Sequence, residues 1–474
     1  MNNILTEVLN EFEQIARIPR PSKHEDKIAN YLVGRLISIG AEAFCDSVGN
    51  VIAEIEPTPG LEDKPVIIMQ AHMDMVCVNS NERSDYNPMT DEINLIKDEH
   101  YLRAVGTSLG ADDGMGIAII LYILQNQQEH GRQRVIFTVD EEVGMSGAAG
   151  LDKKYLDGNY LINIDSENAD ELVIGCAGSL KIELSRNIEW TKPELKSAYK
   201  INVTGLKGGH SGEVIHIKHT NAIKVMAQVI EQLNCEVASI SGGRAMNVIP
   251  SECEAVIITD SDNVNEICDK AATAIKSHYD EPNIKIKAVS TDMPNKVISD
   301  KDKDSLLDVA GFLMDGLYDD ETSANIGTIQ IIEDKIHLQY MPRFHTKHGQ
   351  SVMGHMAAEA ARRSGYDINI HKPSPAWHSE SNSLSQLMTD IGLKQGRQLT
   401  ERIIHGGLEC SFFSQKNPEL TIISIGTTNI DIHSPKERLL LSSVEPTVNL
   451  LMETLSVINN VNDYTTKVVS LGEN

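Results

Sequence analysis

Short apolar segments that alternate with helical patterns are the feature that most restricts the fold of this sequence. Segments typical of buried strands lie at 51–55, 66–69, 135–139, 161–164 and 420–425. Helical patterns lie among them, as at 114–125 and 444–458. Because strands alternate with helices, we expect a layered α/β domain built on a largely parallel, mixed sheet.

The N-terminal segment predicts two helices separated by a short break. Apolar residues recur on one face of the first, at about 4–18, and Pro19 ends it. Ser22 followed by Glu25 has the spacing of a capping box, in which each side chain bonds the backbone at the start of a helix. We therefore expect a second helix that begins there and runs to Gly40.

The stretch from about 181 to 378 has a different order of elements. It begins with strand, helix, strand, strand, helix and strand patterns at 200–204, 221–233, 236–241, 254–259, 264–278 and 284–289. This is the β-α-β-β-α-β order of ferredoxin-like domains. A similar helix, strand, strand, helix and strand series follows at 305–317, 328–332, 336–340, 351–364 and 368–371, which raises the question of an internal duplication. We expect an inserted α+β ferredoxin-like domain at 182–378, with 1–181 and 379–474 rejoining as one domain.

Length and composition agree with this organisation. The 474 residues are too many for one compact core, so two domains are expected. The formal net charge of −26 disfavours nucleic acid as a partner, because a polyanion is normally bound by a basic surface. The seven cysteines form no C-x-x-C pair, and neither a signal-peptide pattern nor a membrane-spanning run is found. These features predict a protein of the reducing cytoplasm with no membrane partner.

The segment VIIMQAHMDMV at 66–76 places two candidate residues two positions apart. On a strand such residues point to the same side, so His72 and Asp74 can act together. A neutral imidazole is a good zinc ligand, and a carboxylate on its other nitrogen fixes its tautomer and orientation. The alternative interpretation is a buried histidine that a neighbouring acid merely satisfies.

Two further segments place carboxylates beside predicted elements. In GADDGMG at 110–116, Asp112 could bridge two cations with its two oxygens, although acids that cap the start of a helix are common. In VIFTVDEEVGMSGA at 135–148, three consecutive acids follow an apolar strand. This arrangement suits a division of labour in which Glu142 binds a metal and Glu141 is the general base. The base would take a proton from the activated water and pass it to the leaving amine.

Asp165, in YLINIDSE, and His433, in TIISIGTTNIDIHSP, complete the candidate set. Singly, each is more simply explained as a turn or surface residue. Together, four of the five candidates follow apolar strands, and α/β proteins place their sites at the carboxyl ends of parallel strands. Two histidines and three carboxylates suit Zn²⁺, Mn²⁺ or Co²⁺. We therefore expect two divalent ions, with zinc favoured, held by His72, Asp112, Glu142, Asp165 and His433.

A set of motifs spread over the chain supports this interpretation. The motifs are IPRPSKHE (18–25), QAHMDMV (70–76), GTSLGADDGMG (106–116), DEEVGMSGA (140–148), INIDSE (162–167), GCAG (175–178), GLKGGHSGE (205–213), HGGLEC (405–410) and HSP (433–435). In these motifs the chain resembles the co-catalytic zinc exopeptidases, which include carboxypeptidase G, tripeptidase T and the carnosinases. Within that family it more closely resembles the aminoacyl-histidine dipeptidases, also called peptidase D or Xaa-His dipeptidases.

The resemblance implies how the metals are shared. His72 and Asp165 would hold one metal, Glu142 and His433 would hold the other, and Asp112 would bridge them. The resemblance also implies a role for the inserted domain, which is similar to the family's lid, through which relatives form homodimers.

The resemblance further implies substrate contacts. His210 would stabilise the oxyanion, Asn247 and Arg343 would grip the substrate carboxylate, and Glu409 would engage the free α-amino group. The family usually has Asn where this chain has Asp113, a difference that affects only the charge balance of the site.

The expected reaction is hydrolysis of dipeptides with a free N-terminus, of the Xaa-His and β-alanyl-His type and of broad range. A tripeptidase or an N-acyl-amino-acid amidohydrolase would use the same metals and is the nearest alternative. From a different class, a non-catalytic metal-binding interaction protein is disfavoured because Glu141 and every candidate ligand are present. A two-metal phosphodiesterase is disfavoured by the acidic charge balance.

Overall fold

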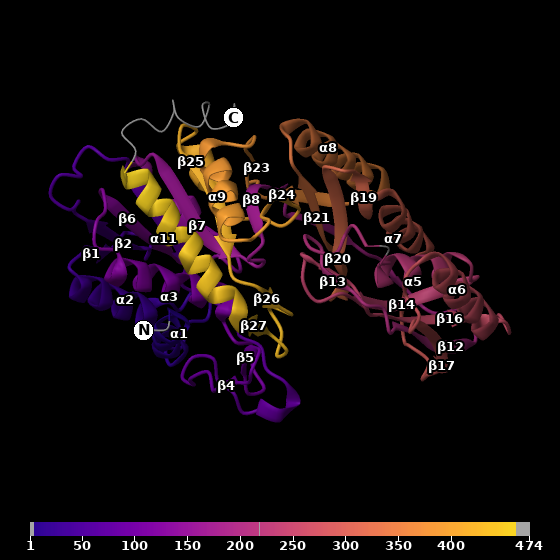
Figure 1. The fold of residues 1–474 in the computed structure, drawn as a ribbon. Coiled ribbons are helices and arrows are strands. Elements are labelled where there is room, and N and C mark those ends of the chain that lie inside the picture. Colours follow the sequence, from indigo (N-terminus) through magenta and orange to yellow (C-terminus); the bar gives the residue numbers. More distant parts are fainter. Residues whose placement is uncertain (1–3, 218, 461–474) are drawn as a thin grey trace. The chain divides into compact units, whose positions relative to one another are not determined.

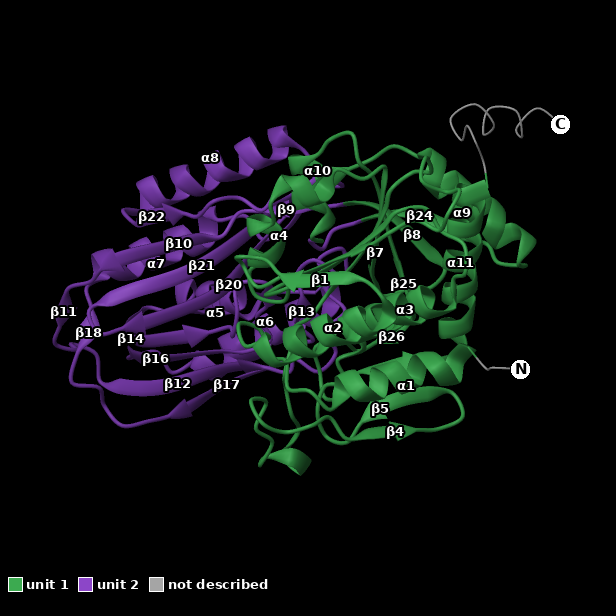
Figure 2. Ribbon diagram, turned by 90° about the vertical axis from the view of Figure 1, so that its left-hand side faces the viewer, with its two compact units in different colours: residues 1–175, 377–403, 408–474 green, residues 176–376, 404–407 purple. Residues whose placement is uncertain are grey.

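The computed structural model describes residues 4–217 and 219–460 and divides into two compact units (Figures 1 and 2). Unit 1 comprises residues 1–175, 377–403 and 408–474, and unit 2 comprises residues 176–376 and 404–407. The boundaries expected from the sequence lay after residues 181 and 378. The short segment 404–407 belongs to unit 2, although the chain on either side of it belongs to unit 1.

The main sheet of unit 1 is mixed and has the strand order β1-β2-β6-β3-β7-β25-β8-β23. Its strands are β1 (Glu42–Cys45), β2 (Val51–Ile55), β3 (Ile67–His72), β6 (Gln133–Thr138), β7 (Tyr160–Ser166), β8 (Glu171–Cys176), β23 (Trp377–His378) and β25 (Thr421–Gly426), with β24 (Thr400–Ile404) paired to β8. The strands β6, β3, β7 and β25 run parallel to one another. The expected α/β class with a mixed sheet is confirmed.

Both faces of the parallel strands are covered, as their continuous apolar runs require. Every residue of β3 and β6 is buried. Ile67, Met69 and Ala71 point to one face and share a hydrophobic core with α1 (Ile4–Ala16), α2 (Asp26–Ile39), α3 (Ala111–Asn126), α9 (Ser383–Lys394) and α11 (Val444–Asn460). The shorter helices of unit 1 are α4 (Ser146–Gly150) and α10 (Cys410–Lys416). No helix in the described ranges is long and apolar enough to cross a membrane.

The helix α2 begins later than the sequence predicts. Its first residue is Asp26, and the preceding Glu25 makes no capping hydrogen bond through its side chain. The capping box of Ser22 and Glu25 is therefore wrong, because both side chains bond residues far along the chain. The other end is as expected, since Gly40 adopts the left-handed conformation (φ 102°) that glycine tolerates best.

Unit 2 is built on an antiparallel sheet with the order β17-β12-β16-β14-β20-β21-β10-β22. Its strands are β10 (Ile182–Asn187), β12 (Ser197–Thr204), β14 (Cys235–Gly242), β16 (Cys253–Thr259), β17 (Lys285–Ser290), β20 (Thr322–Ile332), β21 (Lys335–Phe344) and β22 (Asp367–Ile370). The helices α5 (Ala222–Glu231), α6 (Val264–His278), α7 (Asp300–Phe312) and α8 (Lys347–Ser364) share one hydrophobic core with it.

The same topology occurs in each half of this sheet. The order β17-β12-β16-β14 is that of a β-α-β-β-α-β unit whose first strand lies beside its fourth and third. The order β22-β10-β21-β20 repeats it, with α7 and α8 as the helices. Pairing of β14 with β20 joins the halves into one sheet.

A small sheet in unit 1 positions the chain around His433. Its order is β26-β27-β5-β4, with β4 at Leu95–Lys97, β5 at Tyr101–Ala104, β26 at Asn429–Ile430 and β27 at Arg438–Leu440. His433 lies in the turn between β26 and β27. The pairing of β27 with β5 brings this turn back to the segment that leads into α3.

Candidate metal centre

The five predicted ligands converge at the carboxyl ends of the parallel strands in unit 1. His72 is the last residue of β3, and Asp165 is the last residue but one of β7. Glu142 follows β6 and His433 follows β25, while Asp112 lies in the first turn of α3. Because parallel strands end at the same edge of a sheet, segments more than 350 residues apart meet there.

Asp112 stands between the two histidines. Its Oδ1 lies 2.9 Å from Nε2 of His72, and its Oδ2 lies 3.0 Å from Nε2 of His433. Asp165 Oδ1 lies 3.3 Å from the same nitrogen of His72, and Glu142 Oε2 lies 2.9 Å from that of His433. The result is two groups of three ligands that share Asp112, with the ligand atoms of each group within 4.8 Å of one another.

This arrangement fits a pair of divalent cations. The ligand atoms of a tetrahedral zinc ion stand about 3.3 Å apart, given Zn–N and Zn–O bonds of about 2.0–2.2 Å. The separations around Asp112, 2.9–3.3 Å, are close to this value. Each group offers one imidazole nitrogen and carboxylate oxygens from two acids, the ligand chemistry that Zn²⁺, Mn²⁺ and Co²⁺ accept.

The pKa values of the buried acids and of His433 also indicate a site that favours bound positive charge. Burial raises the pKa of Glu142 to about 7, with the negative charge of Asp112 adding to the effect. Burial likewise raises the pKa of Asp165 to about 6, against the opposing charge of His72. Burial alone would lower the pKa of His433, but its hydrogen bonds to Asp112 and Glu142 raise it to about 12. The raised pKa values of these carboxyls and of His433 reflect the negative charge gathered in the cluster, which divalent cations would balance.

Asp74 connects the ligand segments. It is fully buried, and its Oδ1 lies 3.4 Å from Nδ1 of His72, which also lies 3.1 Å from the Asp74 carbonyl oxygen. Its carboxylate accepts hydrogen bonds from the backbone N–H groups of Glu141 (3.0 Å) and Glu142 (3.2 Å) and from the hydroxyl of Ser22 (2.7 Å). The same carboxylate therefore orients His72 and fixes the segment that carries Glu141 and Glu142.

Glu141 lies beside the cluster. One of its carboxylate oxygens is within 4.8 Å of ligand atoms of His72 and Glu142. Burial raises the pKa of Glu141 well above its ordinary value, and the charges of Asp165 and Glu142 raise it further against that of His72. A buried carboxyl in this position can accept a proton and release it again.

In unit 2, the three predicted substrate-binding residues lie next to one another. Arg343 Nη2 is 3.4 Å from Nε2 of His210, and Arg343 Nε donates to Oγ of Ser211 at 3.4 Å. The Ser211 N–H donates to the carbonyl oxygen of Asn247 at 2.8 Å, and β13 (Gly209–His210) pairs with β15 (Val248–Ile249). Residues separated by more than 130 positions thus form one local group within this unit.

Comparison with known proteins identifies the family. Residues 68–457 match the family model of peptidase family M20/M25/M40. The chain belongs to this family. The cytosol non-specific dipeptidase of Escherichia coli (strain K12) is 30% identical over 470 residues, which cover 94% of this chain and 96% of that protein. Peptidase T of Brevibacillus brevis is 29% identical over 222 residues, 37% of this chain and 54% of that protein.

Comparison with solved structures also finds peptidases that share the fold of this chain. The aminoacylhistidine dipeptidase from Vibrio alginolyticus matches with a TM-score of 0.76 and 29% identity, covering 96% of this chain and 98% of that one. Human carnosine dipeptidase 1 shares the fold at 12% identity, with a TM-score of 0.55 and coverage of 96% and 97%. The resemblance drawn from the sequence motifs is confirmed, and this M20 chain is a metallopeptidase.

Glu409 of this M20 chain lies deeper than the ligands. Its side chain is fully buried, and its Oε2 accepts hydrogen bonds from Nε2 of Gln70 (2.7 Å) and Oγ1 of Thr138 (2.5 Å). Burial raises the pKa of Glu409 to about 8. Its contact with a substrate amino group stays a prediction.

His405, from the HGGLEC motif, was given no role by the sequence. Its Nε2 lies 2.6 Å from Oγ of Ser323, and its Nδ1 lies 3.1 Å from Nε2 of His345, both of unit 2. Burial lowers the pKa of His405 to about 4, with His345 and Arg343 adding to the effect. These contacts explain why the segment 404–407 belongs to unit 2.

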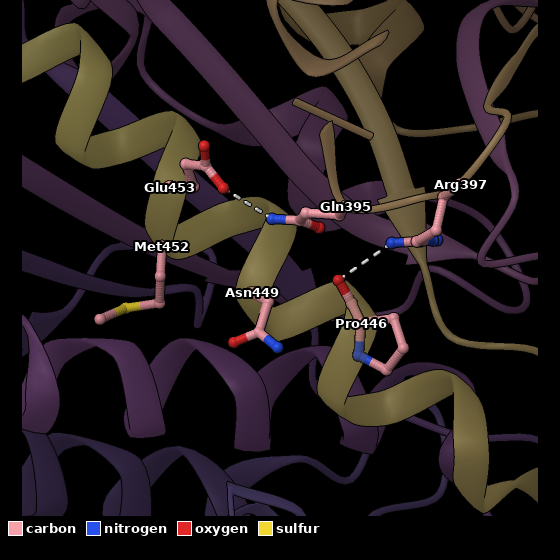
Figure 3. A pocket seen from close by; sticks show the side chains of 6 residues that line it. All are labelled: Gln395, Arg397, Pro446, Asn449, Met452 and Glu453. Atoms are coloured by element: carbon pink, nitrogen blue, oxygen red, sulfur yellow. Dashed lines mark hydrogen bonds between the residues drawn. The ribbon is translucent and has the colours of Figure 1, made fainter. Parts of the chain in front are cut away.

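A cavity elsewhere in unit 1 takes no part in the centre. It has a volume of about 540 Å³ and lies against α11 (Figure 3). Two hydrogen bonds, from Gln395 to Glu453 and from Arg397 to the carbonyl of Pro446, cross it. Its lining is Gln395, Arg397, Pro446, Asn449, Met452 and Glu453. It holds none of the predicted site residues.

Proposed function

We propose that this M20 peptidase hydrolyses dipeptides with a free N-terminus, of the Xaa-His and β-alanyl-His type and of broad range, using two divalent cations. The observation that carries the proposal is the position of Asp112, whose two oxygens face the nitrogens of two different histidines. Zn²⁺ is the expected ion, and Mn²⁺ and Co²⁺ are the alternatives. The E. coli relative, a dipeptidase by name, matches nearly the whole chain and supports the substrate class.

Each ligand group would hold one cation. His72 and Asp165 belong to one group, Glu142 and His433 to the other, and Asp112 to both. Bound there, the cations would polarise the scissile carbonyl and make water acidic enough to attack at neutral pH. Asp74 would keep His72 in the tautomer that leaves Nε2 free to bind.

Glu141 would move the proton. It stands within 4.8 Å of the ligand atoms without belonging to either group that contains Asp112. As a general base it would take a proton from the attacking water onto its carboxylate, and as a general acid it would give that proton to the departing amine nitrogen. The Asp74 carboxylate accepts the backbone N–H of Glu141, which restricts the movement of the segment that carries the Glu141 side chain.

The group in unit 2 would recognise the substrate. Arg343 is 5% exposed, and its guanidinium contacts Ser211 and His210. Burial lowers the pKa of Arg343 to about 10 without removing its charge at neutral pH. A buried guanidinium of this kind is suited to the carboxylate of a substrate, with Asn247 beside it. His210 would donate to the oxyanion, a contribution of about 3–4 kcal/mol in comparable sites.

Location and assembly are part of the proposal. The E. coli relative is a cytosolic protein by name, and cysteines that form no disulfide are usual in a reducing compartment. We therefore expect the enzyme in the cytoplasm. We also expect a homodimer formed through unit 2, whose sheet ends in the edge strands β17 and β22. Measuring the molecular mass in solution tests this expectation.

A substrate panel tests the proposed activity. The purified enzyme, freed of metal by a chelator and reloaded with Zn²⁺, Mn²⁺ or Co²⁺, would be assayed with β-alanyl-His, Leu-Gly, Leu-Gly-Gly and N-acetyl-amino acids. We expect turnover of the dipeptides, loss of turnover with chelator and recovery with metal. Turnover of the acylated compounds alone would refute the dipeptidase assignment, and a preference for Leu-Gly-Gly would favour a tripeptidase.

A further inference from the structure

A buried arginine ties two of the ligand segments together. Arg20 is 2% exposed, and its Nη1 donates to the carbonyl oxygens of Met73 (2.9 Å) and Asp74 (2.8 Å). Its Nη2 donates to the carbonyl oxygen of Gly110. The first two carbonyls follow His72 directly, and the third lies two residues before Asp112. A single rigid guanidinium thus spans the loop after β3 and the start of α3.

The chain around Arg20 reaches the third ligand segment as well. Ser22 donates its hydroxyl to Oδ2 of Asp74, and Glu25 Oε1 accepts the backbone N–H of Asp140 at 3.0 Å. Pro21 forms a parallel bridge with Met75, and the Met75 N–H donates to the Arg20 carbonyl at 3.1 Å. Residues 20–25 therefore contact all three loops that carry His72, Asp112 and Glu142.

Glu437 connects the His433 segment to the same point. It is 3% exposed, and its Oε2 accepts the backbone N–H groups of Leu109 (2.8 Å) and Gly110 (3.1 Å). Its Oε1 accepts that of Ala111 at 2.9 Å. Gly110 is thus held from both sides, with its N–H on Glu437 and its carbonyl on Arg20.

The fit around Gly110 leaves little freedom. A Cβ added at Gly110 would lie 2.7 Å from Arg20 Nη2, and one added at Gly114 would lie 2.6 Å from the same atom. Gly110 also has a φ of 70°, which an L side chain rarely adopts. The guanidinium therefore packs directly against the turn that sets the position of Asp112.

We infer that Arg20 and Glu437 are positioning residues that fix Asp112 between its two histidines, Arg20 from the side of His72 and Glu437 from the side of His433. The inference rests on the proposed metal centre. A buried arginine or glutamate needs partners, and both side chains use backbone groups adjacent to the ligands rather than each other. Partners of this kind set ligand geometry, and their mutation typically costs about 10- to 100-fold in metal affinity or activity.

The test compares variants of the full chain by metal binding. Arg20→Met removes the three donors, and Glu437→Gln leaves an amide where three N–H groups need acceptors. We expect each to lower the affinity for Zn²⁺ by about 10- to 100-fold, measured by competition with a chromophoric chelator. The visible spectrum of the Co²⁺-loaded variants should change, and kcat should fall by more than KM changes.

Matched controls separate positioning from stability. Arg134 is a buried arginine of unit 1 that bonds Glu54, Asp157 and the Tyr155 carbonyl, none of them in a ligand segment. Glu281 is a buried glutamate that accepts the backbone N–H of Lys207 at 2.9 Å. Arg134→Met and Glu281→Gln should lower thermal stability while leaving Zn²⁺ affinity and the Co²⁺ spectrum as in the wild type.

The outcomes are distinct. Wild-type affinity and an unchanged Co²⁺ spectrum in folded Arg20→Met and Glu437→Gln protein would overturn the inference. If Arg20→Met does not fold, Arg20→Lys decides instead, because one ammonium cannot replace the guanidinium fork. A wild type that binds two metals but cleaves no dipeptide refutes the proposed function, while the affinities still judge Arg20 and Glu437. A wild type that binds no metal overturns both.

Discussion

Removing the metals should make the stability of unit 1 fall as the pH rises. In the metal-free protein, burial raises the pKa of Glu142 from 4.5 to about 7 and that of Asp165 from 3.8 to about 6. The folded state therefore keeps protons that the unfolded chain releases between about pH 4 and pH 7. Because the folded state binds more protons in this window, the free energy of unfolding decreases as pH rises through it.

The magnitude follows from the pKa values. A pKa raised from 4.5 to about 7 corresponds to about 3 kcal/mol of stability that is present at pH 4.5 and lost above pH 7. The raised pKa of His433, about 12, acts in the same direction, because its stabilising contribution is fully present below its ordinary value of 6.5 and is lost progressively as the pH rises from there. Bound cations would hold the carboxylates ionised and the imidazoles neutral, so the loss should disappear in loaded protein.

The assay is urea unfolding of metal-free and Zn²⁺-loaded protein between pH 5 and pH 8. Trp377 lies in unit 1 and Trp190 in unit 2, and they are the two tryptophans of the chain. The Trp190→Phe background therefore makes fluorescence report on unit 1. We expect the difference in stability between loaded and metal-free protein to grow across this range, with Glu142 contributing about 3 kcal/mol and Asp165 and His433 adding to it. Glu142→Gln, which lacks this titrating carboxyl, should lower the slope of the metal-free curve and leave the part that Asp165 and His433 contribute. A difference that stays constant with pH would refute the reasoning.

Three substitutions test individual roles. Glu141→Gln should keep both metals but lower kcat by about 10²- to 10⁴-fold, because the proton carrier is lost, and metal analysis beside the assay would show an inactive but loaded enzyme. Asp112→Asn should weaken the binding of both ions, so that elemental analysis after dialysis finds fewer than two ions per chain. Two tightly bound ions in this variant would contradict the bridging role of Asp112. Arg343→Met should raise KM for Leu-Gly at full metal occupancy, and an unchanged KM would remove Arg343 from substrate binding.

The sequence was sufficient to predict the residues that converge. His72, Glu142, Asp165 and His433 follow apolar runs, and the carboxyl ends of parallel strands share one edge of a sheet, so these patterns taken together with the family motifs predicted that the four meet. Asp112 was predicted from its place at the start of a helix, and its distances to both histidines agree with that prediction.

The supporting residues escaped prediction for a physical reason. A serine followed three positions later by a glutamate has the same pattern whether it caps a helix or supports a distant loop. In this chain Ser22 bonds Asp74, and Glu25 accepts the N–H of Asp140 in addition to that of Lys23, while α2 begins only at Asp26. Nothing near Glu437 in sequence reveals that its carboxylate will accept the N–H groups of residues 109–111.

One local signal did favour the long-range interpretation. Arg20 precedes Pro21, and the residue before a proline is disfavoured in the helical region of backbone space. In the structure the next residue, Pro21, forms a parallel bridge with Met75. That bridge sets the arginine side chain against the carbonyls that follow His72. Pro21 therefore lies in the segment between α1 and α2, and residues of this segment contact the loops that carry the ligands.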